Sequence, residues 1–197
     1  MGASNMLQGE VYLNSQQYAR IDRLRRWKRS REKYVNSFQK AGTSIIVDSI
    51  ESKNDDQDSL PLNQHIRFRV QANSTGDYIF MPINLFSGFE TNPFIATNRF
   101  SDVNFGYRQN ISFSTYIEVP DGYAPDALPK SLQLVNTDKT VIFIRELFDD
   151  PANKKVLARV RIEFKKSLYT VDEYSELKEF YKKMFDMLNE QVVFKKK

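Results

Sequence analysis

The sequence predicts a mostly β (α+β) fold, namely an antiparallel β-sandwich of about eight strands flanked by an N-terminal and a C-terminal amphipathic helix. Three observations favour this class. Apolar and polar residues alternate in several separate segments, which is typical of half-buried strands. Turn residues separate these segments. Apolar residues recur at helical spacing only near the two ends of the chain, so two sheets with helices against them bury every apolar face.

The strand signals fill the middle of the chain. The clearest lie at 64–72 and 155–166, where apolar residues alternate with charged ones. We expect 64–72 to form a hairpin with 78–81, and 130–135 to form another with 140–148, because turn residues separate each pair. The expected strands are 9–13 (a short lead-in), 43–52, 64–72, 78–81, 103–107, 110–119, 130–135, 140–148, 155–166 and 191–194.

A first amphipathic helix is predicted over residues 16–41. Gly42 suits the left-handed position that follows the last turn of a helix. The segment 20–33 holds eight basic and two acidic residues, a net charge of +6, so the rest of the chain sums to −2 because the total is +4. The apolar stripe consists of Tyr18, Ile21, Leu24, Trp27, Tyr34, Val35 and Phe38.

A second amphipathic helix is predicted at about 171–190. Thr170 and Glu173 have the spacing of a capping box, in which each side chain bonds the backbone of the other residue. The apolar stripe of this helix consists of Tyr174, Leu177, Tyr181, Met184, Phe185 and Leu188.

Length and composition favour one domain over residues 9–197. Residues 1–8 are expected to be a non-native remnant or a disordered start, because they begin with small and polar residues. The start lacks the apolar centre of a signal peptide, and no apolar run is long enough to cross a membrane.

The stretch 78–107 is unusually aromatic and is interrupted by prolines and glycines. We interpret it as a strand, a long packed crossover and the start of another strand. Its aromatic rings could instead stack on sugars, but filling the sandwich is the simpler role for most of them.

Composition excludes several chemistries. The chain has no cysteine, so disulfides, thiolate metal sites and a cysteine nucleophile are absent. Its one histidine, His65, lies near the start of a predicted strand with no nucleophile nearby, so we expect it to be a surface residue. The acidic segment 54–58 could offer oxygens to calcium, but its spacing does not match an EF-hand loop and favours a solvated turn. We therefore expect no enzyme activity, no cofactor and no metal.

The basic helix could track phosphates or an anionic surface. Its aromatic residues lie on the apolar stripe, however, so a nucleic acid partner is not favoured. A candidate binding surface is nevertheless assigned to Arg23, Arg26, Trp27, Arg99 and Tyr107.

Several short motifs resemble one known family. They are Met81-Pro82-Ile83-Asn84, Asn92-Pro93-Phe94, Arg99, Val103-Asn104-Phe105-Gly106-Tyr107, Ile117 to Tyr123, Leu128-Pro129-Lys130, Tyr174 to Tyr181 and Val192 to Lys195. Together they resemble the C-terminal domain of unknown function of bacterial transglutaminase-like proteins, which are multidomain envelope proteins with a papain-like core. Asp102 stands where the resemblance implies a proline.

The resemblance implies a non-catalytic β-sandwich accessory module of a Gram-negative periplasm or cell envelope. Such a module would pack against or position a catalytic core, or bind a partner. The catalytic core of these proteins uses cysteine, so no catalytic residue carries over. The alternatives are a stand-alone carbohydrate- or peptide-binding module and a basic-helix binder of an anionic surface.

Overall fold

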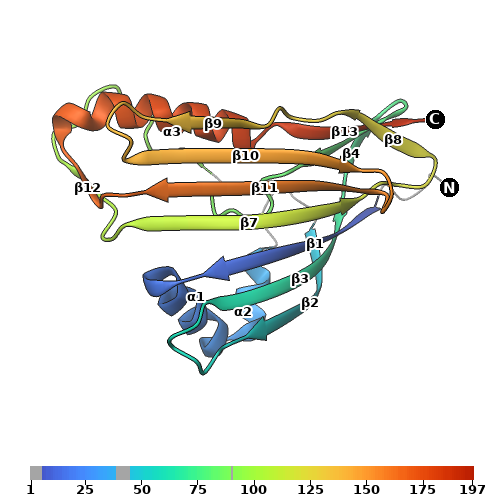
Figure 1. The fold of residues 1–197 in the computed structure, drawn as a ribbon, viewed down its shortest axis with the longest axis horizontal. Coiled ribbons are helices and arrows are strands. Elements are labelled where there is room, and N and C mark those ends of the chain that lie inside the picture. Colours follow the sequence, from blue (N-terminus) through green and yellow to red (C-terminus); the bar gives the residue numbers. More distant parts are fainter. Residues whose placement is uncertain (1–5, 39–44, 90) are drawn as a thin grey trace.

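The computed structural model describes residues 6–38, 45–89 and 91–197, and it confirms the predicted mostly β, sandwich-like class. A seven-stranded antiparallel sheet forms the largest layer (Figure 1). Its strands, from one edge to the other, are β2 (Ile45–Lys53), β3 (Leu62–Gln71), β1 (Met6–Ser15), β7 (Gln109–Glu118), β11 (Lys155–Phe164), β10 (Val141–Asp150) and β9 (Leu132–Val135).

A four-stranded sheet forms part of the second layer. Its order is β4 (Asn73–Thr75), β5 (Tyr78–Pro82), β13 (Gln191–Lys196) and β8 (Tyr123–Ala127). β6 (Val103–Asn104) and β12 (Leu168–Tyr169) make a separate two-stranded pair. The helical elements are α1 (Gln17–Arg29), α2 (Arg31–Asn36), the short 3-10 helix η1 (Val171–Glu173) and α3 (Tyr174–Leu188).

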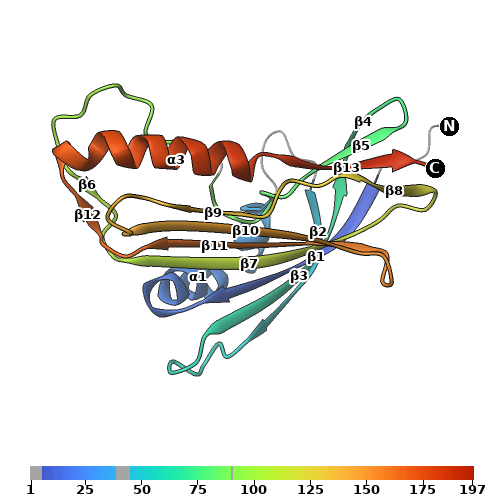
Figure 2. The same ribbon diagram turned by 45° about the horizontal axis from the view of Figure 1, so that its top comes forward.

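The core lies between the large sheet and the second layer. Figure 2 shows α3 and the small sheet over one face of the large sheet. Alternate residues of the strands are buried on this face, as Phe143 and Val160 are, because successive side chains of a strand point to opposite faces. Within the described residues, no helix or strand covers the opposite face, which we call the outer face.

The aromatic crossover is mostly core, as predicted. Phe86, Phe89 and Phe94 are buried, and Phe94 packs edge-on against Tyr181 of α3. Phe100 is the exception, with 97% of its surface exposed.

The capping box predicted at the start of the second helix is confirmed. The backbone N–H of Thr170 donates to Glu173 Oε2 at 2.8 Å, and the Thr170 side chain accepts from the backbone of Glu173. This pair satisfies backbone donors that a helix start leaves free.

The prediction of one continuous first helix is wrong. Ser30 has extended backbone angles and separates α1 from α2, and its side-chain oxygen accepts a hydrogen bond from Lys33 N at 3.2 Å. Serine favours this N-cap geometry over the interior of a helix. The residues predicted to end the helix, 39–41 with Gly42, lie outside the described residues.

The N-terminal prediction also needs correction. β1 begins at Met6, and Leu7 is buried opposite Val70, so residues 6–8 are not a disordered start. The expected short lead-in at 9–13 is a ten-residue strand inside the sheet, between β3 and β7. Residues 1–5 lie outside the described part of the chain.

The expected pairings are confirmed at one hairpin and corrected at the other. β9 pairs with β10, as predicted. β3, however, pairs with β1 and β2, and only its short continuation β4 forms the hairpin with β5. The strand expected at 191–194 is confirmed as β13, which lies between β5 and β8.

Candidate binding groove on the outer sheet face

The centre of the outer face is built around β1, which is hydrogen-bonded to a strand on each side. Its buried residues Val11 and Leu13 alternate with Tyr12 and Asn14, which point to the outer face. The register places Tyr12 between His65 of β3 and Ser114 of β7. In the same way it places Asn14 between Asn63 and Ser112. Pairing therefore brings polar side chains from three distant segments into adjacent rows.

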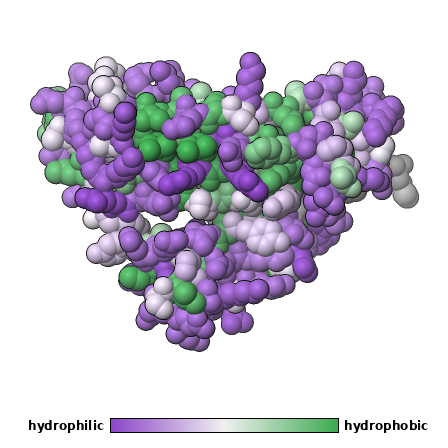
Figure 3. Space-filling model, in the orientation of Figure 1, coloured by the Kyte–Doolittle hydropathy of each residue, from purple (hydrophilic) through white to green (hydrophobic). Residues whose placement is uncertain are grey.

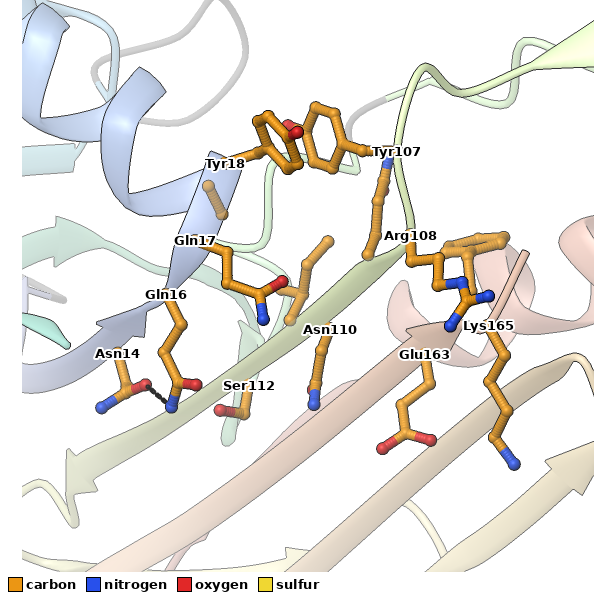
Figure 4. Close-up of a pocket in the computed structure, with 14 residues that line it drawn as sticks. Asn14, Gln16, Gln17, Tyr18, Tyr107, Arg108, Asn110, Ser112, Glu163 and Lys165 are labelled. Carbon is orange, nitrogen blue, oxygen red and sulfur yellow. Dashed lines mark hydrogen bonds between the residues drawn. The ribbon is translucent and has the colours of Figure 1, made fainter. Parts of the chain in front are cut away.

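A pocket of about 500 Å³ opens where β1 runs into α1 (Figure 4). Figure 3 shows the surface hollowed between α1 and β7. Carboxamide side chains dominate the wall, because the end of β1, the start of α1 and the start of β7 are all rich in them. The pocket is lined by Asn14, Gln16, Gln17, Tyr18, Ala19, Tyr107, Arg108, Gln109, Asn110, Ile111, Ser112, Glu163, Phe164 and Lys165.

Two tyrosines form the upper wall of this pocket. Tyr18 of α1 and Tyr107, just before β7, stack with ring centroids 4.9 Å apart and an interplanar angle of 27°. Tyr18 remains 60% exposed, so the pair presents aromatic surface to solvent. Gln17 has a φ of 49°, which is unusual for a residue other than glycine and is a form of local strain found at functional sites.

A second pocket of about 560 Å³ continues the first along the outer face and shares Asn14 and Ser112 with it. Here the rings of Tyr12 and His65 are stacked, with centroids 4.3 Å apart and an interplanar angle of 4°. We call the two pockets together the β1 groove. It has an aromatic pair at each end and amide and hydroxyl groups between them.

Glu10 holds the far end of the groove in place. Its Oε2 accepts a hydrogen bond from Tyr12 OH at 3.1 Å and lies 3.4 Å from His65 Nε2. Burial alone raises the pKa of Glu10, but the hydrogen bond from Tyr12 and the nearby His65 lower it overall. His65 is thus a half-buried wall of the groove that faces a carboxylate, which is more than the surface position expected from the sequence.

The acidic segment 54–58 has a structural task that the sequence did not suggest. Asp58 pairs with the buried Arg20 at 2.9 Å, and Asp56 pairs with Lys28 at 2.7 Å. Trp27 Nε1 donates to Asp55 Oδ2 at 3.0 Å. The segment is a solvated turn, as predicted, with Asp56 89% and Asp58 94% exposed, but it also binds the basic helix. Within the described residues, no group of three or more potential metal ligands was found.

The candidate surface predicted from the sequence does not form one site. Trp27 is buried, Arg23 donates to Tyr34 OH at 3.0 Å, and Arg26 pairs with Asp22 at 2.9 Å. Arg99 lies 5.9 Å above the ring of Tyr174. Of the five predicted residues, only Tyr107 lines the β1 groove.

The other half of the outer face carries apolar residues in two clusters, separated by the paired Glu146 and Arg159. Register places Val135 beside Ile142 and Phe148 beside Leu157, and Ile144 points to the same face two residues from Ile142. Val135 is 42% and Phe148 45% exposed. These five residues form the apolar patch, and Figure 3 shows hydrophobic surface over β9, β10 and β11.

Sequence reasoning missed most of the groove. Tyr12, Asn110 and Ser112 lie in segments predicted only as strands, and Asn14 lies between a predicted strand and the first predicted helix. The available signal was the kind of residue on the outward positions, because solvated strand faces usually carry charges, whereas β1 and β7 carry tyrosine, asparagine and serine. That signal does not reveal which strands are neighbours.

The fold and the groove together define a β-sandwich domain with a polar groove on its uncovered face. Residues 77–194, more than half of the chain, match a family described as a domain of unknown function with a solved structure, DUF3858. The chain belongs to this family. No curated protein and no solved structure matches it.

The groove is built partly from residues inside the region that matches the family and partly from residues that precede it in the sequence. Tyr107, Asn110 and Ser112 lie within it, whereas Asn14 and Tyr18 precede it. β1 is nevertheless paired with β7 over Gly9–Asn14, so the preceding strands continue the sheet of the family region. No helix among the described residues is long and apolar enough to span a membrane.

Proposed function

We propose that the chain is a non-catalytic accessory module of a transglutaminase-like envelope protein and that its apolar patch packs against the catalytic core. The observation that carries the proposal is the patch itself. It lies on an uncovered sheet face in two parts, with Glu146 and Arg159 between them, and exposed apolar areas rimmed by polar residues commonly mark contacts with another protein or domain. All five patch residues lie in the region that matches the family.

The chemistry of the chain supports a role without turnover. The papain-like core of transglutaminase-like proteins uses a cysteine, and this chain has none. Its one histidine is stacked on Tyr12 and faces Glu10, in a groove whose other polar groups are amides, hydroxyls and five charged side chains. The motif resemblance at the crossover and at the C-terminus supports the transglutaminase-like context, with the periplasm or cell envelope as the place of action.

The charges of α1 weigh against the basic-helix alternative. Three aspartates of the acidic loop contact Arg20, Trp27 and Lys28, so part of the basic segment serves to hold the helix on the domain. A surface that tracks phosphates needs those cations free to release counterions.

The test uses the transglutaminase-like core that the proposal expects in the same protein, expressed separately. Wild-type chain should bind it, and I144S combined with F148S should weaken binding by about ten-fold or more, since buried apolar anchors dominate interface energies. K182S, on the exposed side of α3 in the other layer, is the matched control and should bind as wild type does. Undiminished binding by the patch variant, or turnover of a glutamine or peptide substrate by the purified chain, would contradict the proposal.

A further inference from the structure

We propose that the β1 groove binds a neutral oligosaccharide, a role independent of the docking of the apolar patch. The first argument is the chemistry of the wall. Carboxamides can donate and accept hydrogen bonds at once, as adjacent sugar hydroxyls require. Apart from the buried Gln64, six carboxamides line the groove, and two serine hydroxyls lie between them. These residues are Asn14, Gln16, Gln17, Asn63, Gln109 and Asn110, with Ser112 and Ser114.

The second argument is the aromatic surface at each end. The stacked pair Tyr18 and Tyr107 is partly exposed at one end, and Tyr12, 45% exposed, stacks on His65 at the other. Stacking fixes these rings before a ligand arrives, so binding costs little side-chain entropy. Flat aromatic surfaces suit the apolar C–H faces of sugar rings, and the polar groups between them suit the hydroxyls.

The third argument is charge. Arg108, Lys165 and Lys53 against Glu163 and Glu51 leave the groove lining at +1 with His65 neutral. A groove for a polyanion instead concentrates lysine and arginine. The low net charge therefore favours a neutral ligand.

A peptide is disfavoured by the backbone. Peptides that bind sheets commonly add a strand at a free edge, where unpaired N–H and C=O groups are available. β1 is paired with β3 on one side and with β7 on the other, so the groove offers side chains and not a sheet edge. Gln16 lies four positions after Tyr12, about 13 Å along an extended chain. That length suits several linked sugar rings better than a single one.

The experiment titrates the intact chain with cellohexaose, xylohexaose, maltohexaose and chitohexaose by isothermal calorimetry, with heparin as the polyanion. At least one neutral hexasaccharide should bind. Y18A and Y107A should each weaken that binding by about ten-fold, a loss of about 1.4 kcal/mol. N110A should weaken it as well, through a polar contact.

Y78A is the matched control, because Tyr78 lies in β5 of the small sheet, lines neither pocket and should leave affinity unchanged. Melting temperatures of the variants separate loss of binding from loss of folding. Three results would overturn the proposal: no binding to any hexasaccharide, binding that Y18A, Y107A and N110A all leave unchanged, or heparin binding that exceeds neutral binding and is lost in the same variants.

Discussion

Trp27 Nε1 donates a hydrogen bond to Asp55 Oδ2 at 3.0 Å, and this contact ties the basic helix α1 to the acidic loop between β2 and β3. The two segments looked like separate binding candidates in the sequence. In the structure the two segments bind each other, because the loop carboxylates hydrogen-bond the indole of Trp27 and form ion pairs with Arg20 and Lys28. These contacts hold α1, whose residue Tyr18 lines the groove, against the domain.

Removing the carboxylate of Asp55 should loosen α1. D55A leaves the buried indole N–H and Ser52 Oγ, which donates to Asp55 Oδ1, without their acceptor. We expect the free energy of unfolding to fall by about 1–2 kcal/mol, measured by urea denaturation. D56N is the control and should change stability little, because its partner Lys28 is exposed. Equal losses in D55A and D56N would show that the indole contact is not what matters.

Arg145 is the strongest polar element of the core. It is fully buried and donates to Lys130 O at 2.8 Å, to Met187 O and to Glu190 Oε2 at 2.9 Å, thereby joining β10 to the end of α3. R145M leaves Lys130 O without its side-chain donor, takes one donor from Met187 O and should cost about 2–4 kcal/mol in unfolding free energy.

E190Q tests how much of the stabilisation by Arg145 comes from its ion pair with Glu190 and how much from its hydrogen bonds to the two carbonyls. Glu190 is about half exposed, so its charge is screened and its replacement should cost well under 1 kcal/mol. A loss in E190Q as large as that in R145M would mean that the ion pair, and not the carbonyl contacts, secures this junction.

Gly9 allows β1 to pass close to Phe68. A Cβ at this position would lie 2.5 Å from Cζ of Phe68 and 3.0 Å from the carbonyl oxygen of Tyr116. G9A should therefore destabilise the protein by about 1–3 kcal/mol through overpacking. F68L should recover part of that loss in the double variant, because it removes the nearest ring atoms. Q8A, at the exposed neighbouring position, is the control, and a G9A protein as stable as Q8A would contradict the packing seen here.

Glu173 should make part of the stability dependent on pH. The hydrogen bond from Lys166 and the backbone N–H of Thr170 hold the pKa of Glu173 below its ordinary value of 4.5. A lowered pKa in the folded state means that this stabilisation is complete above pH 4.5 and is lost as the pH falls below it.

E173Q isolates this effect. The stability difference between wild type and E173Q in urea should be largest near about pH 7 and should shrink by about pH 3. E179Q, which changes an exposed glutamate of α3, should show no such trend. A difference between wild type and E173Q that stays constant over this range would rule out the assigned role.

Strands and helices were predicted correctly from the sequence where one face of the element is buried and the other is exposed. Strand 155–166 and the helix that starts after Thr170 were located because local alternation and capping decide them. The break at Ser30 was hidden because the apolar positions resume in phase at Tyr34. β8 was missed because Pro125 is unexpected in a strand, although it is tolerated there at the edge of the small sheet.

The groove could not be predicted because it depends on pairing between distant strands. Tyr12, His65 and Ser114 become neighbours only when β1 inserts between β3 and β7. No local pattern fixes that order, since strand pairing is decided by the packing of the whole sheet. Arg145, in contrast, was visible in principle, because it occupies an inward position among Val141, Phe143 and Leu147.

The most direct test of the central claim is chemical-shift mapping of the ¹⁵N-labelled chain with the tightest-binding neutral hexasaccharide. We predict that the perturbed amides cluster along the β1 groove, at Tyr12, Asn14, Tyr18, Tyr107, Asn110 and Ser112, with the apolar patch unaffected. Perturbations centred on the exposed face of α1 or on β9 and β10, with no shift change at the groove amides, would contradict the assignment of the β1 groove as the ligand site.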